Sequence, residues 1–234
     1  MLIRIPKGWE LPESAATPES VFRDRRRLLK TAAAGSILVS ASGLLAGCDS
    51  EEEIAIQTAP DPSGHLYPVP RNEKFVLDRD LTSEELATTY TNYYEFGSSK
   101  KIWKRARNLP IRPWTVTIGG MVEQEMQVDI DDLLAKMPLE ERLYRLRCVE
   151  AWSMAVPWSG FPMRALVDMA RPLSGAKYVK MITFKNLDAA IGQRESWYPW
   201  PYVEGLTIEE ATNDLAFLAT GLYGKPIPKQ NGAP

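Results

Sequence analysis

The sequence predicts an α+β domain that follows an export signal and a linker. Patterns typical of strands and of short helices are mixed along the chain without a regular βαβ rhythm. Neither a Gly-x-Gly-x-x-Gly nor a Walker sequence occurs in it. Its composition, 44% hydrophobic and 25% charged over 234 residues, is that of a globular protein. These observations exclude a wholly disordered, a collagen-like and a polytopic membrane protein.

Helices are expected at four places. Residues 82–85 (TSEE) begin the first, because hydroxyl side chains cap free amides and acids suit the positive helix end. Residues 129–137 begin with acids, end after a lysine and are stopped by Pro138. An apolar repeat of helical period predicts a helix over 163–170, and 208–212 is expected to form a helical turn.

Strands are also expected at four places. Residues 114–118 alternate in polarity and are followed by Gly119-Gly120, which indicates a hairpin. Residues 142–149 alternate long and short side chains, and 178–184 are a further strand. Residues 215–222 are apolar enough for a buried strand.

The first 47 residues are typical of a signal peptide. Residues 24–30 (DRRRLLK) match the twin-arginine export consensus, and an apolar run over 28–47 follows. That run has many small residues and one lysine, so it is a weak candidate for a permanent membrane span. An amphipathic basic helix lying on a membrane is the alternative, although the run has no polar face. Since twin-arginine export carries folded proteins, a cofactor inserted before export is expected.

The signal ends in Leu44-Leu45-Ala46-Gly47-Cys48, which resembles a lipoprotein signal whose cysteine is lipidated. An unmodified signal cleaved nearby is the alternative. Residues 48–80 are acidic and contain prolines, so they are expected to be a linker, and 81–234 to hold the folded domain. If Cys48 is lipidated, Cys148 is the remaining thiol and no disulfide can form within the chain.

Charge and histidine content exclude several functions. The formal net charge is −2, which gives no basic footprint for nucleic acid. With one histidine, His65, in a stretch typical of a solvated loop, a zinc site or a Ser-His-Asp triad would depend on that residue alone.

Cys148 lies in Arg147-Cys148-Val149-Glu150, where a thiol, a cation and a carboxyl group stand close together in the sequence. Flanking cations favour the thiolate, the form that attacks or binds metal. If the segment is extended, Glu150 lies on the same face and places a proton-exchanging carboxyl beside the sulfur. From chemistry alone, a functional thiolate and a buried structural cysteine both stay open.

Residues 138–162 around RCVEAWSM make the sequence recognisable. With YYEFG at 93–97, YVEGL at 202–206 and YGKP leading to QNGAP at 223–234, they resemble the molybdopterin-containing catalytic subunits of bacterial periplasmic protein-methionine-sulfoxide reductases. These belong to the sulfite oxidase fold superfamily. The resemblance runs from about residue 82 to the end of the chain and includes the twin-arginine signal.

The resemblance implies a mononuclear molybdenum–molybdopterin cofactor with Cys148 as the metal ligand. It implies further that the pterin and its phosphate are held by Asn92, Tyr94, Glu95, Thr183 and Asn231. A soft thiolate suits a thiophilic metal, and polar side chains suit a buried cofactor. Glu150 is the candidate proton carrier near the metal, so Cys148 and Glu150 are the predicted catalytic residues.

The sequence departs from the family pattern in two ways. Thr91 stands where the family has the first of two asparagines, which alters one pterin contact. The chain also stops at Pro234, before the cofactor-binding arginine and Gly/Lys loop of the family, so we expect a C-terminally truncated domain. Such a chain is expected to leave residues 215–222 short of neighbouring strands and to be poorly soluble or free of cofactor.

The expected function is therefore reduction of methionine sulfoxide in periplasmic proteins by oxygen-atom transfer. The implied electron donor is a haem-containing membrane partner, and export would use the twin-arginine machinery. A metal-free folded fragment or interaction module is one alternative. Sulfite oxidation is another, and a basic anion pocket around the metal would favour it.

Overall fold

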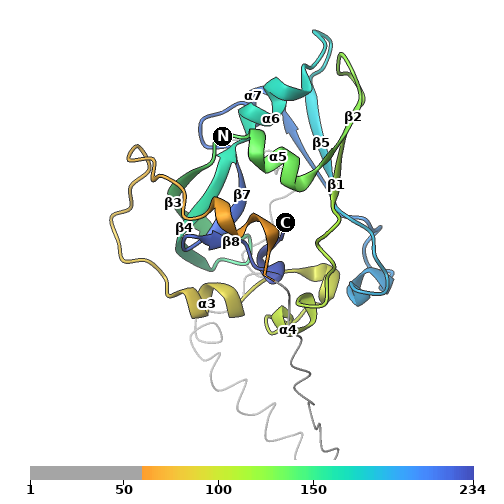
Figure 1. The fold of residues 1–234 in the computed structure, drawn as a ribbon. Coiled ribbons are helices and arrows are strands. Elements are labelled where there is room, and N and C mark those ends of the chain that lie inside the picture. The colour runs from red at the N-terminus through yellow and green to blue at the C-terminus, as the bar shows by residue number, and fades with distance from the viewer. Residues whose placement is uncertain (1–59) are drawn as a thin grey trace, which may run out of the picture. The chain divides into compact units, whose positions relative to one another are not determined.

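The computed structural model describes residues 60–234 (Figure 1). The predicted signal peptide, Cys48 and the first part of the predicted linker lie outside the described residues. The helices are α3 (Glu84–Thr89), α4 (Trp103–Ala106), α5 (Ile130–Lys136), α6 (Met163–Ala170) and α7 (Ile208–Ala211). Four 3-10 turns are also present: η2 (Pro62–Leu66), η3 (Tyr94–Phe96), η4 (Ile191–Arg194) and η5 (Lys229–Asn231). No helix among residues 60–234 is long and apolar enough to cross a membrane.

The strands form three small antiparallel sheets. The largest has the order β3 (Glu140–Arg147), β4 (Ser153–Pro162), β7 (Phe217–Leu222) and β8 (Lys225–Pro226). The other two pair β1 (Thr115–Ile118) with β2 (Met126–Asp129), and β5 (Tyr178–Ile182) with β6 (Val203–Thr207). Helices and strands are thus interspersed, and the predicted α+β class is confirmed.

Local capping signals place the helices. Ser83 caps α3 by accepting from the Leu86 amide, and Asp129 caps α5 by accepting from the Asp131 amide at 2.9 Å. At α7, Thr207 and Glu210 form a reciprocal capping box. The predicted helices are therefore confirmed to within a residue or two.

Strands β2, β4, β6 and β8 were not predicted from sequence. β4 contains Pro157 and Gly160, residues that normally argue against a central strand. Tertiary packing overrides that preference, because β4 pairs with β3 on one side and β7 on the other. At the bulge beside Gly160, a Cβ would lie 2.0 Å from the carbonyl oxygen of Leu218, so only glycine allows this approach.

β7 begins two residues later than expected, at Phe217, because Leu215 lies in the preceding turn and is exposed. Within the described chain it has neighbours on both sides. β4 lies on one side of β7, and β8 pairs with the last two residues of β7, Gly221 and Leu222. The expected shortage of neighbouring strands therefore concerns only the first residues of β7, on the side that faces away from β4.

The described part of the predicted linker, residues 60–80, packs against the domain. The Asn72 amide donates to the Glu141 carbonyl and the Glu141 amide to the Pro70 carbonyl, each at 2.8 Å. This segment therefore pairs with the outer edge of β3 at its start, through Glu141. Phe75 is buried there and meets Tyr144 edge-on, with ring centroids 5.3 Å apart. A single buried aromatic gives little periodic signal, which is why the sequence indicated a linker.

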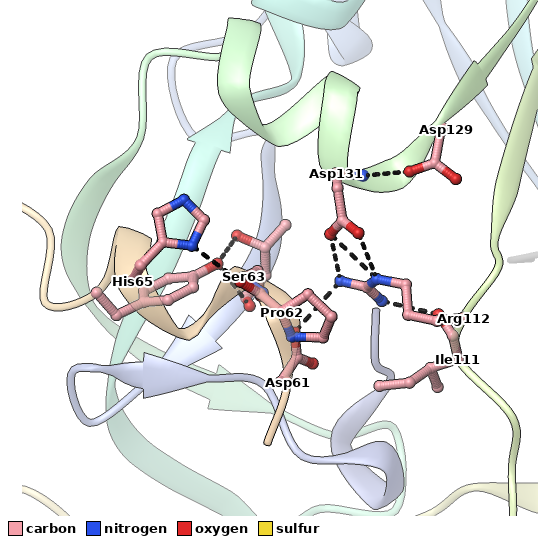
Figure 2. A network of polar contacts seen from close by, with 10 residues as sticks. Asp61, Pro62, Ser63, His65, Ile111, Arg112, Asp129 and Asp131 are labelled. Atoms are coloured by element: carbon pink, nitrogen blue, oxygen red, sulfur yellow. Dashed lines mark hydrogen bonds and ion pairs between the residues drawn. The ribbon is translucent and has the colours of Figure 1, made fainter. Parts of the chain in front are cut away.

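A polar network holds the start of the same segment (Figure 2). Arg112 donates hydrogen bonds of 2.8–3.0 Å to the Asp131 carboxylate through Nε and a terminal nitrogen. A further hydrogen bond of 3.3 Å joins a terminal nitrogen of Arg112 to Asp61. Asp61 in turn accepts from the Ser63 amide at 2.9 Å. His65 is exposed and bonds the Pro62 carbonyl oxygen, so it takes part in no catalytic cluster of the described residues.

Candidate functional site

Cys148 lies in a tight turn between β3 and β4. Its amide donates to the Trp152 carbonyl at 2.9 Å, and its carbonyl accepts from the Ala151 amide at 3.0 Å. Ala151 adopts a positive φ of 70°, which closes the turn. The predicted extended stretch through Val149 is therefore wrong beyond Arg147. Glu150 is not on a shared strand face; the turn brings its amide to 3.5 Å from the Cys148 sulfur.

The segment that faces this turn is anchored by aromatic packing. Phe96 is fully buried in a cluster with Ile102 and Leu109, and Tyr93 meets Phe96 edge-on at 4.8 Å. η4 packs closely against η3, because a Cβ on Gly192 would lie only 2.3 Å from the Tyr94 carbonyl oxygen. The buried aromatics and this close contact fix the backbone that carries Asn92 and Tyr94.

Asn92 contacts the sulfur directly. Its Nδ2 donates to Cys148 Sγ at 2.9 Å, across 56 residues of sequence. Lys100 donates to the Asn92 side-chain oxygen, which orients the amide with its N–H groups toward the sulfur. A donor to sulfur stabilises negative charge on it, so this arrangement suits a thiolate.

Glu150 is held by two donors. Lys100 forms an ion pair with its carboxylate and the Tyr94 hydroxyl donates to it. The hydrogen bonds from Lys100 and Tyr94 lower the pKa of Glu150 to about 2, and the same bond raises the pKa of Tyr94. At neutral pH Glu150 is thus an ionised acceptor and Tyr94 keeps its proton. Glu150 is therefore an ionised hydrogen-bond acceptor in this arrangement, and its role as a proton carrier stays a prediction.

A cavity of about 300 Å³ opens beside Cys148. Thr91, Asn92 and Asn231 line it together with aromatic and aliphatic side chains. Two polar atoms on its lining residues, the Trp152 indole nitrogen and the Asn231 side-chain oxygen, are buried without a hydrogen-bond partner. Unpartnered buried polar atoms cost free energy, so their presence here is typical of a site that accepts a polar ligand.

Two of the predicted cofactor residues lie elsewhere. Thr183 follows β5 and lines a separate, larger cavity of about 1200 Å³ between β1, β5 and α6. Glu95 is buried in η3, and burial raises the pKa of its carboxyl. The described structure therefore brings together Cys148, Glu150, Asn92, Tyr94 and Asn231, whereas the cofactor roles of Thr183 and Glu95 stay predictions.

Comparison with known proteins decides the family. Residues 105–234 match the oxidoreductase molybdopterin binding domain model. The chain is 43% identical over 230 residues to the protein-methionine-sulfoxide reductase catalytic subunit of Burkholderia mallei. The matched region covers 97% of this chain and 67% of that protein. Its counterpart in Pseudomonas syringae pv. tomato is 40% identical over 100% of this chain and 71% of its own length.

The chain belongs to the family of protein-methionine-sulfoxide reductase catalytic subunits. A third relative with the same name, from Xanthomonas axonopodis pv. citri, is 44% identical over 96% of this chain and 67% of its own length. The resemblance found in the sequence is confirmed, and with it a molybdopterin-binding oxidoreductase domain.

The site suits the cofactor that this reductase family implies. Among residues 60–234, no three His, Cys, Asp or Glu side chains converge on a metal position. A metal bound to Cys148 would therefore take its other ligands from outside these side chains, as a pterin dithiolene provides. The unpartnered atoms of Trp152 and Asn231 would provide a donor and an acceptor for a polar pterin.

Lys100 and Trp152 are site residues that sequence reasoning did not single out. Lys100 lies in a Ser-Ser-Lys-Lys loop typical of solvated surface, and no spacing connects it to Glu150. Trp152 belongs to the RCVEAWSM block, so that block was the available signal for it. Lys100 becomes identifiable only when its contacts with Asn92 and Glu150 are seen.

Proposed function

We propose that the chain reduces methionine sulfoxide in proteins at a molybdenum–molybdopterin centre held by Cys148. The observation that carries this proposal is the Cys148 sulfur beside a cavity with unpartnered polar atoms, in a chain whose relatives are named protein-methionine-sulfoxide reductases. When bound, the cofactor supplies an acceptor for the sulfoxide oxygen and the two electrons of the reduction.

Some residues of the site would hold the metal and others the pterin. Cys148 provides the thiolate ligand, and Asn92 donates to its sulfur. Asn231 and Trp152 provide polar contacts for the pterin, with Tyr94, Glu95 and Thr183 assigned to the cofactor by resemblance.

Protons at the site reside on Tyr94 and Lys100. Because the pKa of Glu150 is about 2, its carboxylate accepts hydrogen bonds from both groups and holds them in place at neutral pH. The Tyr94 hydroxyl and the Lys100 ammonium are then the nearby donors for an oxygen atom that must leave as water.

Sulfite oxidation stays the alternative function, and a basic anion pocket around the metal would favour it. None of the described residues that line the cavity beside Cys148 is a lysine or an arginine. Lys100, a nearby cation, is already paired with Glu150. These side chains therefore give the described part of the cavity no uncompensated positive charge.

We further infer the cellular setting from the N-terminal sequence. Residues 24–30 support export by the twin-arginine machinery and hence a periplasmic location, with oxidised periplasmic proteins as substrates. A lipidated Cys48 would hold the protein at the inner membrane. That position would suit electron delivery from a haem-containing membrane subunit.

Metal content and activity measured together test the function. The full chain is produced in a host that makes molybdopterin, and reduction of methionine sulfoxide in an oxidised protein is followed with a reduced viologen dye. Cys148→Ser is expected to lose molybdenum and activity together, and Cys48→Ser, the matched change at the other cysteine, to keep the metal. Full molybdenum occupancy in Cys148→Ser would refute the ligand assignment, and a metal-free parent would favour the interaction-module alternative.

A further inference from the structure

Four aromatic side chains gather between η4 and β6. This aromatic cluster consists of Trp197, Tyr198, Trp200 and Tyr202. Trp197 meets both Tyr198 and Trp200, with centroids 5.7 and 5.6 Å apart, and Tyr198 stacks on Tyr202 at 5.5 Å. The rings support one another and form a continuous surface.

Much of this surface is open to solvent. Trp197 is 60% exposed and Tyr202 is 43% exposed, and the neighbouring Val203 is also exposed. Large aromatic side chains are normally among the more buried residues of a domain. Contiguous exposed apolar surface of this kind is typical of a binding site.

The aromatic cluster is connected to the site at Cys148 through side-chain contacts. Trp197 meets Tyr94 edge-on, with ring centroids 5.9 Å apart. Tyr94 donates to Glu150, whose amide lies 3.5 Å from the Cys148 sulfur. Trp197 is thus connected to Cys148 through two intervening residues, Tyr94 and Glu150.

We propose that the aromatic cluster binds the polypeptide that flanks the methionine sulfoxide being reduced. This inference rests on the proposed function and specifies its substrate: a protein segment with apolar residues next to the oxidised methionine. The relatives are named as reductases of protein methionine sulfoxide, so their substrate side chain arrives attached to a backbone.

The chemistry of the aromatic cluster fits that occupant. Tyrosine and tryptophan are enriched at the centres of protein interfaces, where they offer large, rigid apolar contact. A methionine side chain is short, so residues on either side of it must come close to the mouth of the site. Apolar flanking side chains would cover Trp197 and Tyr202, which removes their exposed surface from water.

The test compares a small sulfoxide with two peptides. Free methionine sulfoxide reports on the site alone. A short peptide has one methionine sulfoxide between leucines, and its partner has serines in place of the leucines. We expect Trp197→Ala to raise KM for the leucine peptide about tenfold more than KM for free methionine sulfoxide. The serine peptide is expected to resemble the free compound.

Three further variants separate binding from indirect effects. Tyr202 belongs to the aromatic cluster but makes no ring contact with Tyr94 among the described residues. Tyr202→Ala is therefore expected to raise KM selectively for the leucine peptide, as Trp197→Ala does. Trp197→Phe is expected to recover most of the affinity. Tyr178→Ala removes an exposed aromatic at the other end of β5 and is expected to leave the ratio of KM values unchanged.

Binding of the dye-labelled leucine peptide, followed by fluorescence anisotropy on the full chain, gives a readout independent of turnover. If the parent reduces none of the three substrates, the proposed function fails. The inference about the surface then stands or falls on whether Trp197→Ala and Tyr202→Ala weaken peptide binding. Equal effects of Trp197→Ala on all substrates, or no effect of Tyr202→Ala, would overturn it.

Discussion

The side-chain amide of Asn92 donates to the sulfur of Cys148 at 2.9 Å, although 56 residues separate them. The contact joins the segment before η3 to the turn between β3 and β4. Lys100 fixes the orientation of the amide from its other end. A metal ligand and the group that tunes it are thus positioned by two independent parts of the fold.

Asn92→Ala is expected to lower activity at least about tenfold, because loss of a hydrogen bond to a metal ligand has effects of this size. The bond stabilises charge on sulfur, so its loss is also expected to lower the midpoint potential of the metal. An EPR-monitored redox titration checks the shift. An unchanged potential with full metal content would show that the bond is structural.

Gly192→Ala is expected to destabilise the protein by about 2 kcal/mol, because the added methyl overlaps the Tyr94 carbonyl oxygen. Since η3 would have to move, the bond from Tyr94 to Glu150 is expected to weaken and activity to fall. Urea unfolding measures the stability. Gly64→Ala is the matched control, because a Cβ there meets no atom within 4 Å. Equal stability of the two variants would contradict this account.

Arg112→Met is expected to cost about 2 kcal/mol, because Asp61 and Asp131 both lose a charged hydrogen-bond partner. Chemical denaturation provides the measurement. Arg79→Met removes an exposed ion pair with the adjacent Asp78 and is expected to change stability by less than about 0.5 kcal/mol. The prediction fails if both variants unfold at the same denaturant concentration.

Glu95 is expected to make stability depend on pH. Burial raises the pKa of its carboxyl above the ordinary value of 4.5, so the folded state holds the proton more tightly than the unfolded state does. Its contribution is fully present below the unfolded pKa and is lost as pH rises through the folded pKa. Glu95→Gln should flatten this decline, and its stability relative to the parent should increase with pH.

Urea unfolding at several pH values above and below 4.5 checks this expectation. Glu209→Gln, at an exposed position in α7, is the control and is expected to follow the parent. Identical slopes for Glu95→Gln and the parent would show that Glu95 has no role in the pH dependence.

Cys48→Ala is expected to release the mature protein from the inner membrane. The several acyl chains of a lipoprotein anchor stably, at about 0.8 kcal/mol for each buried CH₂. Asp49, directly after the cysteine, would favour retention at the inner membrane. Fractionation of cells decides between the alternatives. If the parent is already soluble in the periplasm, Cys48 is not an anchor.

Local signals predicted α3, α5, α6 and α7, but not the single turn of α4 and not all of the strands. Ser83, Asp129 and Thr207 act within one helical turn, so the sequence contains what determines their caps. β4 depends instead on partners from β3 and β7, and these override the preferences of Pro157 and Gly160. No window of sequence contains that information.

The same distinction applies to the site. The RCVEAWSM block indicated Cys148 and Glu150, and the family resemblance implied Asn92; the structure brings these three residues together. The turn geometry at Glu150 and the part played by Lys100 depend on contacts between segments far apart in the chain. The low pKa of Glu150 follows from those contacts, and no spacing in the sequence indicates it.

Arg112 forms ion pairs with both Asp61 and Asp131, and this places the start of the smallest fragment expected to fold before Asp61. A fragment that begins at residue 81, where the sequence suggested the domain starts, would leave Arg112 with one of its two carboxylates and the edge of β3 bare. It would also expose the surface that Phe75 covers. An expressed domain that is meant to stay monomeric should therefore begin before Asp61, because residues 60–80 belong to the protein's own protection against edge-to-edge aggregation.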